Sequence, residues 1–261
     1  MADLARLRQI MRRLRSADGG CPWDLAQTYA SLVPHTLEEA FEVADAIEQG
    51  QLGELSGELG DLLFQVVFYS QIAEEEGRFG LDDVVGGIEA KLLARHPHVF
   101  GDAAASDAAA VADAWEAGKA AERRAKRGGT VSELDDVALA LPALTRARKL
   151  QKRAARVGFD WPDAAGAWHK LHEEVAELDT ATAAGEPRAI EAELGDLLFS
   201  VVNLARHLDV DPEAALRGAS ARFERRFRHV EARVAAAGER LDDTPLERLD
   251  ALWDEAKRQG L

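Results

Sequence analysis

Glutamate and aspartate recur at helical spacing in this 261-residue chain, and they do so in two places. The heptapeptide Glu-Leu-Gly-Asp-Leu-Leu-Phe occupies residues 58–64 and returns at residues 193–199, 135 positions later. Each copy follows another acidic cluster at the same distance, so the chain holds two matching sets: Glu39, Glu42, Glu58 and Asp61, then Glu174, Glu177, Glu193 and Asp196. A repeated heptapeptide, accompanied by acidic residues at the same offset of 135 positions, indicates a duplicated unit.

Acids that stand three residues apart share one face of a helix. If the two acidic helices of a unit pack together, four or five carboxylates converge, and each pair at ~4 Å repels by about 1 kcal/mol even in water. A divalent cation would remove this repulsion, and several carboxylate oxygens suit Mg²⁺, with Mn²⁺ as the alternative. A solvated acidic face remains the other explanation for either cluster taken alone. A ferritin-like di-iron site is not expected, because no Glu is followed by His three residues later.

Basic residues are duplicated as well. Lys91 and Arg95 stand four apart in the first half, as Arg222 and Arg226 do in the second, and a His-Val pair follows each. Fixed cations beside a metal suit phosphate binding, although a salt-bridged surface would look the same. Two weaker candidates for the phosphates are Lys149 and Lys152.

The apolar residues predict an all-α fold, because they recur at helical spacing and no long stretch alternates with period two. Helices are expected at residues 4–15, through residues 37–47, at about residues 52–76, at residues 81–95 and 143–156, around residues 173–177, from 193 to about 207, and from 211 and 245 onward. Residues 62–69 are apolar nearly all round, which predicts a helix buried on most sides.

The duplication also predicts the domain organisation. We expect tandem helical-bundle domains at residues 1–125 and 133–261, because residues 126–132 follow a charged stretch and contain a Gly-Gly pair typical of a linker.

Composition limits the partners. A formal net charge of −15 argues against binding a nucleic acid polymer through its backbone. Cys21 is the only cysteine, which favours a reducing compartment. No apolar run approaches the roughly 20 residues of a membrane span, so we expect a cytoplasmic protein without membrane contact. The Arg-rich amphipathic start of the chain is interpreted as an ordinary first helix rather than a presequence.

Taken together, these motifs resemble the MazG family of nucleoside triphosphate pyrophosphohydrolases. The resemblance runs through nearly the whole chain and includes the segments 20–24, 58–69, 95–100, 150–161 and 223–227. It implies a helical bundle that forms a homodimer. It also implies Mg²⁺-dependent hydrolysis of nucleoside triphosphates to monophosphates and pyrophosphate, which is housecleaning of the nucleotide pool.

Carried over residue by residue, the resemblance implies a metal site and a phosphate site in the second half. The acids Glu174, Glu177, Glu193 and Asp196 would hold Mg²⁺, with Glu173 beside them to orient water. Arg222 and Arg226 would bind the phosphates. Trp253 stands where a ring stacks on the base, or it anchors the last helix.

The second half is expected to carry the main activity. The first half keeps every matching acid and both cations, so it is not excluded as a second site. The alternative function is a non-catalytic helical interaction protein, in which the acids form a docking face for a basic partner.

Overall fold

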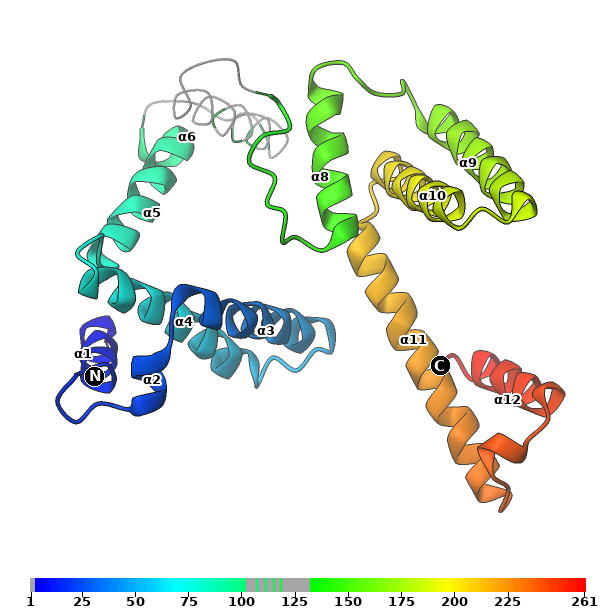
Figure 1. Cartoon of the computed structure of the whole chain (residues 1–261), viewed down its shortest axis with the longest axis horizontal. Helices are drawn as coiled ribbons and strands as arrows, with labels where there is room; N and C mark the ends of the chain where they lie inside the picture. The colour runs from blue at the N-terminus through cyan, green and yellow to red at the C-terminus, as the bar shows by residue number, and fades with distance from the viewer. Residues whose placement is uncertain (1–2, 102–106, 108–110, 112–114, 116–117, 119–131) are drawn as a thin grey trace. The chain divides into compact units, whose positions relative to one another are not determined.

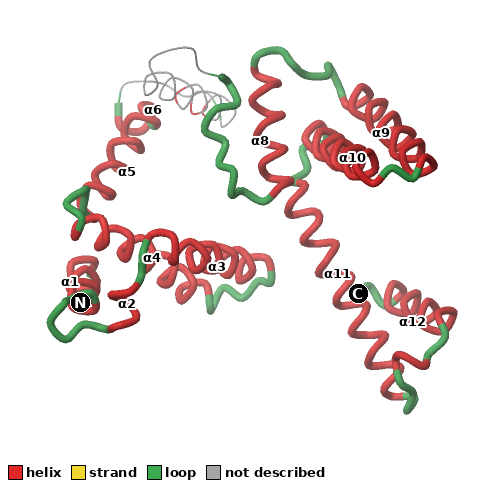
Figure 2. Tube along the Cα trace, in the orientation of Figure 1, coloured by secondary structure: helices red, strands yellow, loops and turns green. Residues whose placement is uncertain are grey.

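The computed structural model describes residues 3–101 and 132–261, with residues 107, 111, 115 and 118 between them. Throughout this part of the chain every regular element is a helix (Figure 2), which confirms the all-α prediction. The chain divides into two compact units, Met1–Glu122 and Arg123–Leu261. The expected linker at 126–132 lies outside the described residues up to residue 131. None of the described helices is long and apolar enough to cross a lipid bilayer.

The first unit is built on a helical hairpin. Its helices are α1 (Leu4–Leu14), α2 (Pro22–Ala26), α3 (Tyr29–Glu48), α4 (Leu55–Glu75), α5 (Leu81–Arg95) and α6 (Pro97–Phe100), shown in Figure 1. The long helices α3 and α4 pack against each other, and α1 and α5 pack on α4. The core is formed by Met11, Leu32, Val67, Phe68, Ile72 and Leu81.

The second unit repeats the hairpin and adds a long arm, formed by residues 212–258. Its helices are α8 (Ala143–Arg156), α9 (Ala164–Ala184), α10 (Pro187–His207), α11 (Pro212–Ala236), the 3₁₀ turn η1 (Leu241–Asp243) and α12 (Leu246–Arg258). Helices α9 and α10 form the hairpin, and α8 packs on α10. Helix α11 contacts α8, and α12 packs against α11 (Figure 1). Between α11 and α12, Val230, Val234 and Leu252 form a second small core.

Local sequence signals set where these helices begin and end. The carboxylate of Asp211 accepts a hydrogen bond from the backbone N–H of Ala214 at 3.0 Å, and Pro212 follows at the first helical position, as the sequence predicted for α11. Gly185 closes α9 in the left-handed conformation with φ of 69°, which lets the chain turn tightly into α10. This turn places the acids of α9 opposite those of α10.

Residues 62–69 form a helix that is covered on most sides, as expected, but one side of it stays exposed. Val67 and Phe68 are buried in the core, but Leu63 and Val66 stay more than a third exposed, and so does Leu59 one turn earlier. The equivalent residues of α10 are exposed too: Leu194, Leu198 and Val201. Each hairpin therefore presents an apolar stripe that its own unit does not cover.

Candidate metal and phosphate site

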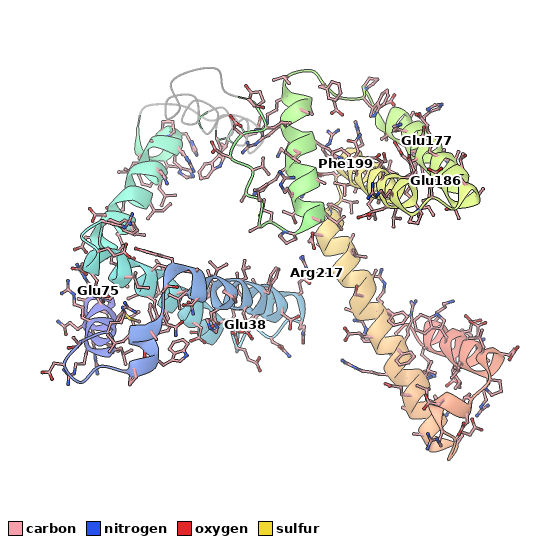
Figure 3. The ribbon with its side chains drawn as sticks, viewed as in Figure 1. Glu38, Glu75, Glu177, Glu186, Phe199 and Arg217 are labelled. Atoms are coloured by element: carbon pink, nitrogen blue, oxygen red, sulfur yellow. The ribbon has the colours of Figure 1, made fainter. Side chains whose placement is uncertain are left out.

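Three carboxylates meet on the α9–α10 hairpin. Glu174 and Glu177 lie one turn apart on α9, Glu193 lies on α10, and one oxygen from each lies within 4.8 Å of the other two. Glu174 is 4% exposed, whereas Glu177, which Figure 3 labels, is exposed. The fourth predicted acid, Asp196, is one turn further along α10 and is not part of this close group.

The α3–α4 hairpin of the first unit holds a matching group. Here Glu39, Glu58 and Asp61 each place one carboxylate oxygen within 4.8 Å of the others. Glu42 is near enough to raise the pKa of both Glu39 and Glu58. The duplicated acids thus come together in both units, although the most closely spaced three differ between them.

Burial and mutual repulsion raise the pKa of several of these acids. Burial is the largest cause for Glu39, and the charges of Asp61 and Glu42 add to it. Burial likewise raises the pKa of Glu58, followed by the charges of Glu42 and Asp61. The side chain of Glu177 is exposed, but desolvation of its carboxyl group raises its pKa, and the charges of Glu174, Glu173 and Glu193 add to this against the opposing charge of Lys170. A cation bound beside the acids of either hairpin would therefore be stabilising, because it would offset their mutual repulsion.

Lys170 is a site residue that the sequence analysis missed. Its Nζ lies 2.8 Å from Oε1 of Glu173 and 2.8 Å from Oε1 of Glu174. Hydrogen bonds from the ammonium group lower the pKa of Glu173, and the two carboxylates raise that of Lys170. In the first unit the equivalent position is His35, whose Nδ1 lies 3.7 Å from Glu38 Oε2. At this position, therefore, a lysine borders the acids of the second unit and a histidine borders those of the first.

The chemistry of the donors fits a hard divalent cation. All three close ligand atoms are carboxylate oxygens, which Mg²⁺, Ca²⁺ and Mn²⁺ prefer. Two oxygens on opposite sides of an octahedral Mg²⁺ are about 4.2 Å apart, and neighbouring ones are about 3 Å apart. One oxygen of each acid lies within 4.8 Å of the other two, so the side chains would move closer together to bind the ion.

The structure places the predicted phosphate-binding arginines on the arm. Arg226 lies on α11, where its Nε donates to the backbone carbonyl of Leu261 at 2.7 Å and its guanidinium lies 5.7 Å from the ring centre of Trp253. The Trp253 ring also contacts Phe223 at 5.2 Å. Arg222 lies one turn before Arg226 on the same helix. The described residues show no contact between this arm group and the acids of α9 and α10.

The other predicted cations lie on helices that flank the hairpins. Lys91 is exposed on α5, and Arg95 on the same helix lies 5.0 Å from the ring centre of Trp115. Lys149 and Lys152 are exposed on α8. Within the described part of the chain, none of them contacts an acid of the two clusters, so their role in phosphate binding remains a prediction.

Comparison with known proteins gives one family. Residues 27–100 and 166–231 match the model of the MazG nucleotide pyrophosphohydrolase domain, and the two matched segments contain the two acidic clusters. The chain is 49% identical to "Nucleoside triphosphate pyrophosphohydrolase" of Escherichia coli K12, over all of this chain and 99% of that protein. It is 44% identical, over 95% of this chain and 93% of the relative, to "Nucleoside triphosphate pyrophosphohydrolase/pyrophosphatase MazG" of Thermotoga maritima. The "Uncharacterized protein YabN" of Bacillus subtilis is 43% identical over 98% of this chain and 52% of its own length.

Proposed function

This chain belongs to the MazG nucleotide pyrophosphohydrolase family, and we propose that it hydrolyses nucleoside triphosphates to monophosphates and pyrophosphate. The observation that carries the proposal is the convergence of Glu174, Glu177 and Glu193 beside the ammonium group of Lys170. A negatively charged triphosphate can approach such an acidic site only with a divalent cation, which these carboxylates are arranged to hold.

We infer that Mg²⁺, or Mn²⁺ in its place, binds at this cluster, with Asp196 joining the three close acids by side-chain rotation. When bound, the ion supplies charge neutralisation for the phosphate oxygens and a lowered pKa for water. The protein's own part is to fix the ligand oxygens. Glu174 does this best, because it is buried and its position is restricted by packing.

Glu173 lies beside the three close acids and is not one of them. The pKa of Glu173 is lowered by Lys170, so Glu173 stays ionised and suits the orientation of water. Lys170 stands 2.8 Å from two carboxylates and can shift its hydrogen bonds to a phosphate oxygen.

We propose that the working form is a homodimer. The stripe Leu194, Leu198 and Val201 is between 43% and 50% exposed, and soluble monomers rarely leave contiguous apolar faces open. Association of two chains would cover these stripes. It would also bring Arg222 and Arg226, which contact none of the acids of α9 and α10 within the described residues, to the phosphates bound by the partner.

We also propose that the protein is cytoplasmic and that it removes unwanted nucleoside triphosphates from the nucleotide pool. The single cysteine suits a reducing compartment, and nucleoside triphosphates are made and used there.

The function is tested by incubating the full chain with ATP, GTP, CTP and UTP in the presence of Mg²⁺ and measuring pyrophosphate release. Glu193→Gln and Glu58→Gln form a matched pair, because the two residues are equivalent positions of the two units. We expect Glu193→Gln to lower kcat by about a thousandfold and Glu58→Gln to lower it much less. A wild-type chain that releases no pyrophosphate from any of the four would support a docking protein instead. Loss of activity in Glu58→Gln alone would move the active site to the first unit.

A further inference from the structure

A pocket of about 500 Å³ lies on the arm, between the C-terminal end of α11 and the helix α12, which pack together in Figure 1. Its lining includes three arginines, Arg233 on α11 and Arg248 and Arg258 on α12. Among the lining residues the one carboxylate is that of Glu255, and the others are three alanines and Leu252. In a chain with a formal net charge of −15, such a group of arginines is a local concentration of positive charge.

This pocket is separate from the group formed by Arg226 and Trp253. Successive residues of an α-helix point about 100° apart, and Leu252 and Ala256 are the buried residues of α12. By this spacing, Trp253 projects to one side of the line through the two buried residues and Glu255 projects to the other. The Trp253 ring, with the Arg226 guanidinium 5.7 Å from its centre, therefore lies on one flank of α12 and the pocket lies on the other.

Two of the three arginines are held by their Nε atoms. Arg233 Nε lies 3.1 Å from Oε1 of Glu255, and Arg248 Nε donates to Oε2 of Glu239 at 2.8 Å. Within the described residues, the terminal nitrogens of these two guanidinium groups make no hydrogen bond. Each carboxylate therefore fixes one edge of a guanidinium and leaves its two terminal NH₂ groups open. Such a fork matches the spacing of two oxygens on one phosphate group.

The third arginine, Arg258, pairs with no carboxylate in the described part of the chain, although acidic residues outnumber basic ones by 47 to 32. It comes three residues after Glu255, one turn further on the same side of α12. The Glu255 carboxylate is already shared, because its Oε1 lies 3.2 Å from Nε2 of His229 and 3.1 Å from Nε of Arg233. Three like charges that line one pocket repel each other, so an anion bound among them would be stabilising.

The lining also indicates what kind of anion would bind. It includes no aromatic ring on which a base or another flat ring could stack, and its apolar part is limited to the alanines and the mostly buried Leu252. The contacts would therefore come from the guanidinium groups. The volume lies within the range of small-molecule sites and gives room for more than one phosphate group. Several forks around one space suit an anion with oxygens on more than one phosphorus atom.

We propose that this pocket binds an inorganic oligophosphate, of which pyrophosphate is the smallest, through the guanidinium groups of Arg233, Arg248 and Arg258. The site goes beyond the proposed function, because it contains none of the acids and none of the arginines assigned to the substrate. The proposal concerns binding alone, so it does not require the chain to hydrolyse nucleotides.

The test is equilibrium dialysis of the full chain against radiolabelled pyrophosphate at low ionic strength in EDTA. The chelator prevents divalent cations from joining the anion to the acids of α9 and α10. We expect saturable binding that weakens as salt is added. Arg258→Gln should lower the affinity by about tenfold or more, and it leaves no carboxylate without a partner. Arg248→Gln should have a similar effect. Unlabelled ADP, which carries the diphosphate on a nucleoside, should compete no better than unlabelled pyrophosphate.

Arg228→Gln is the matched control, because it removes the same charge from the same arm. Arg228 pairs with Glu224 at 3.0 Å in a pair that is mostly exposed, and it does not line the pocket. We expect its affinity for pyrophosphate to stay within about twofold of the wild type, and the same for Arg226→Gln. Melting temperatures identify variants that fail to fold, and Arg258→Gln serves if Arg248→Gln is one of them.

Four results would overturn the proposal. A folded wild type without saturable binding shows that the pocket takes no such anion. Unchanged affinity in the folded pocket variants, or an equal loss in Arg228→Gln, shows that the binding reflects the charge of the arm as a whole. Loss in Arg226→Gln alone places the anion at Trp253. ADP that competes better than pyrophosphate shows that the pocket recognises a nucleoside. Since dialysis measures binding only, a failure of the proposed function would leave each of these results interpretable.

Discussion

Replacement of Lys170 by methionine should make the second unit depend on divalent metal for its stability. The Lys170 ammonium lies 2.8 Å from a carboxylate oxygen of Glu174, whose side chain is only 5% exposed. Removing one partner of a fully buried ion pair costs about 3–5 kcal/mol, and removing one from an exposed pair costs about 0.2–1 kcal/mol. The Lys170 side chain is 37% exposed, so we expect an intermediate cost of about 2 kcal/mol without metal.

The corresponding fall in melting temperature is roughly 6–8 °C for a unit of this size, measured in EDTA by calorimetry. Saturating Mg²⁺ should then restore more stability to Lys170→Met than to the wild type. The reason is that the ion no longer competes with the ammonium for the Glu174 carboxylate. Mg²⁺ at a hundred times its Kd contributes about 2.7 kcal/mol, which is enough to offset the substitution.

Lys257→Met is the matched control. Lys257 pairs with Asp254 at 3.0 Å, three residues away on α12, in a pair whose two side chains are about half exposed. It should cost at most about 1 kcal/mol, with no dependence on Mg²⁺. If the two lysine variants melt alike and Mg²⁺ stabilises the wild type and Lys170→Met equally, the ammonium and the metal do not share the carboxylate and the reasoning fails.

Three further predictions concern the dimer, the ion pair between Asp160 and Arg206, and the packing of Trp161 on Gly166. Mixing inactive Glu193→Gln with inactive Arg226→Ala should restore part of the activity if the arm acts on the partner's acids; a mixture as inactive as its components argues that each chain works alone. Asp160→Asn should lower the free energy of unfolding by about 2 kcal/mol at pH 7 in urea titrations. Arg206 lowers the pKa of this carboxyl, so its contribution is present above about pH 3.9 and is lost as pH falls through the lowered pKa; a cost that persists in acid contradicts the ion pair. Gly166→Ala should destabilise by about 1–3 kcal/mol because its Cβ meets the indole ring, whereas Gly195→Ala, which meets nothing within 4 Å, should not destabilise.

The parts of the fold that could be predicted from the sequence depend on neighbouring residues. The spacing of Glu174 and Glu177 requires only helical geometry, and the cap at Asp211 requires only the residues that follow it. Both could be read without knowing how the helices pack. The duplication could also be found without knowing the packing, because it requires only a comparison of two segments of the amino-acid sequence.

The parts that were missed depend on which helices meet. Lys170, three residues before Glu173, looks like an ordinary surface pair until the hairpin buries Glu174 beside it. Arg233 and Arg258 line one pocket only because α12 packs on α11.

The exposed side of residues 62–69 was not predicted for a related reason. An apolar pattern indicates that a surface is covered, but it does not specify that the same chain covers it. Val66 is 38% exposed in α4 although its neighbour Val67 is fully packed. The pattern therefore predicted the apolar character of the helix and its burial on most sides, but not the side that stays exposed.

The unequal filling of the two cores has a consequence for heat inactivation. Among the largest described side chains with less than 2% exposure, the first unit has Phe68, Met11, Leu32 and Val67, whereas the second has Val202 and Val234. The second unit, which contains the candidate nucleotide site, therefore has less core packing than the first unit. On warming, the second unit should unfold before the first. Loss of turnover should therefore precede unfolding of the whole chain, and a bound nucleotide should raise the temperature of the first transition only.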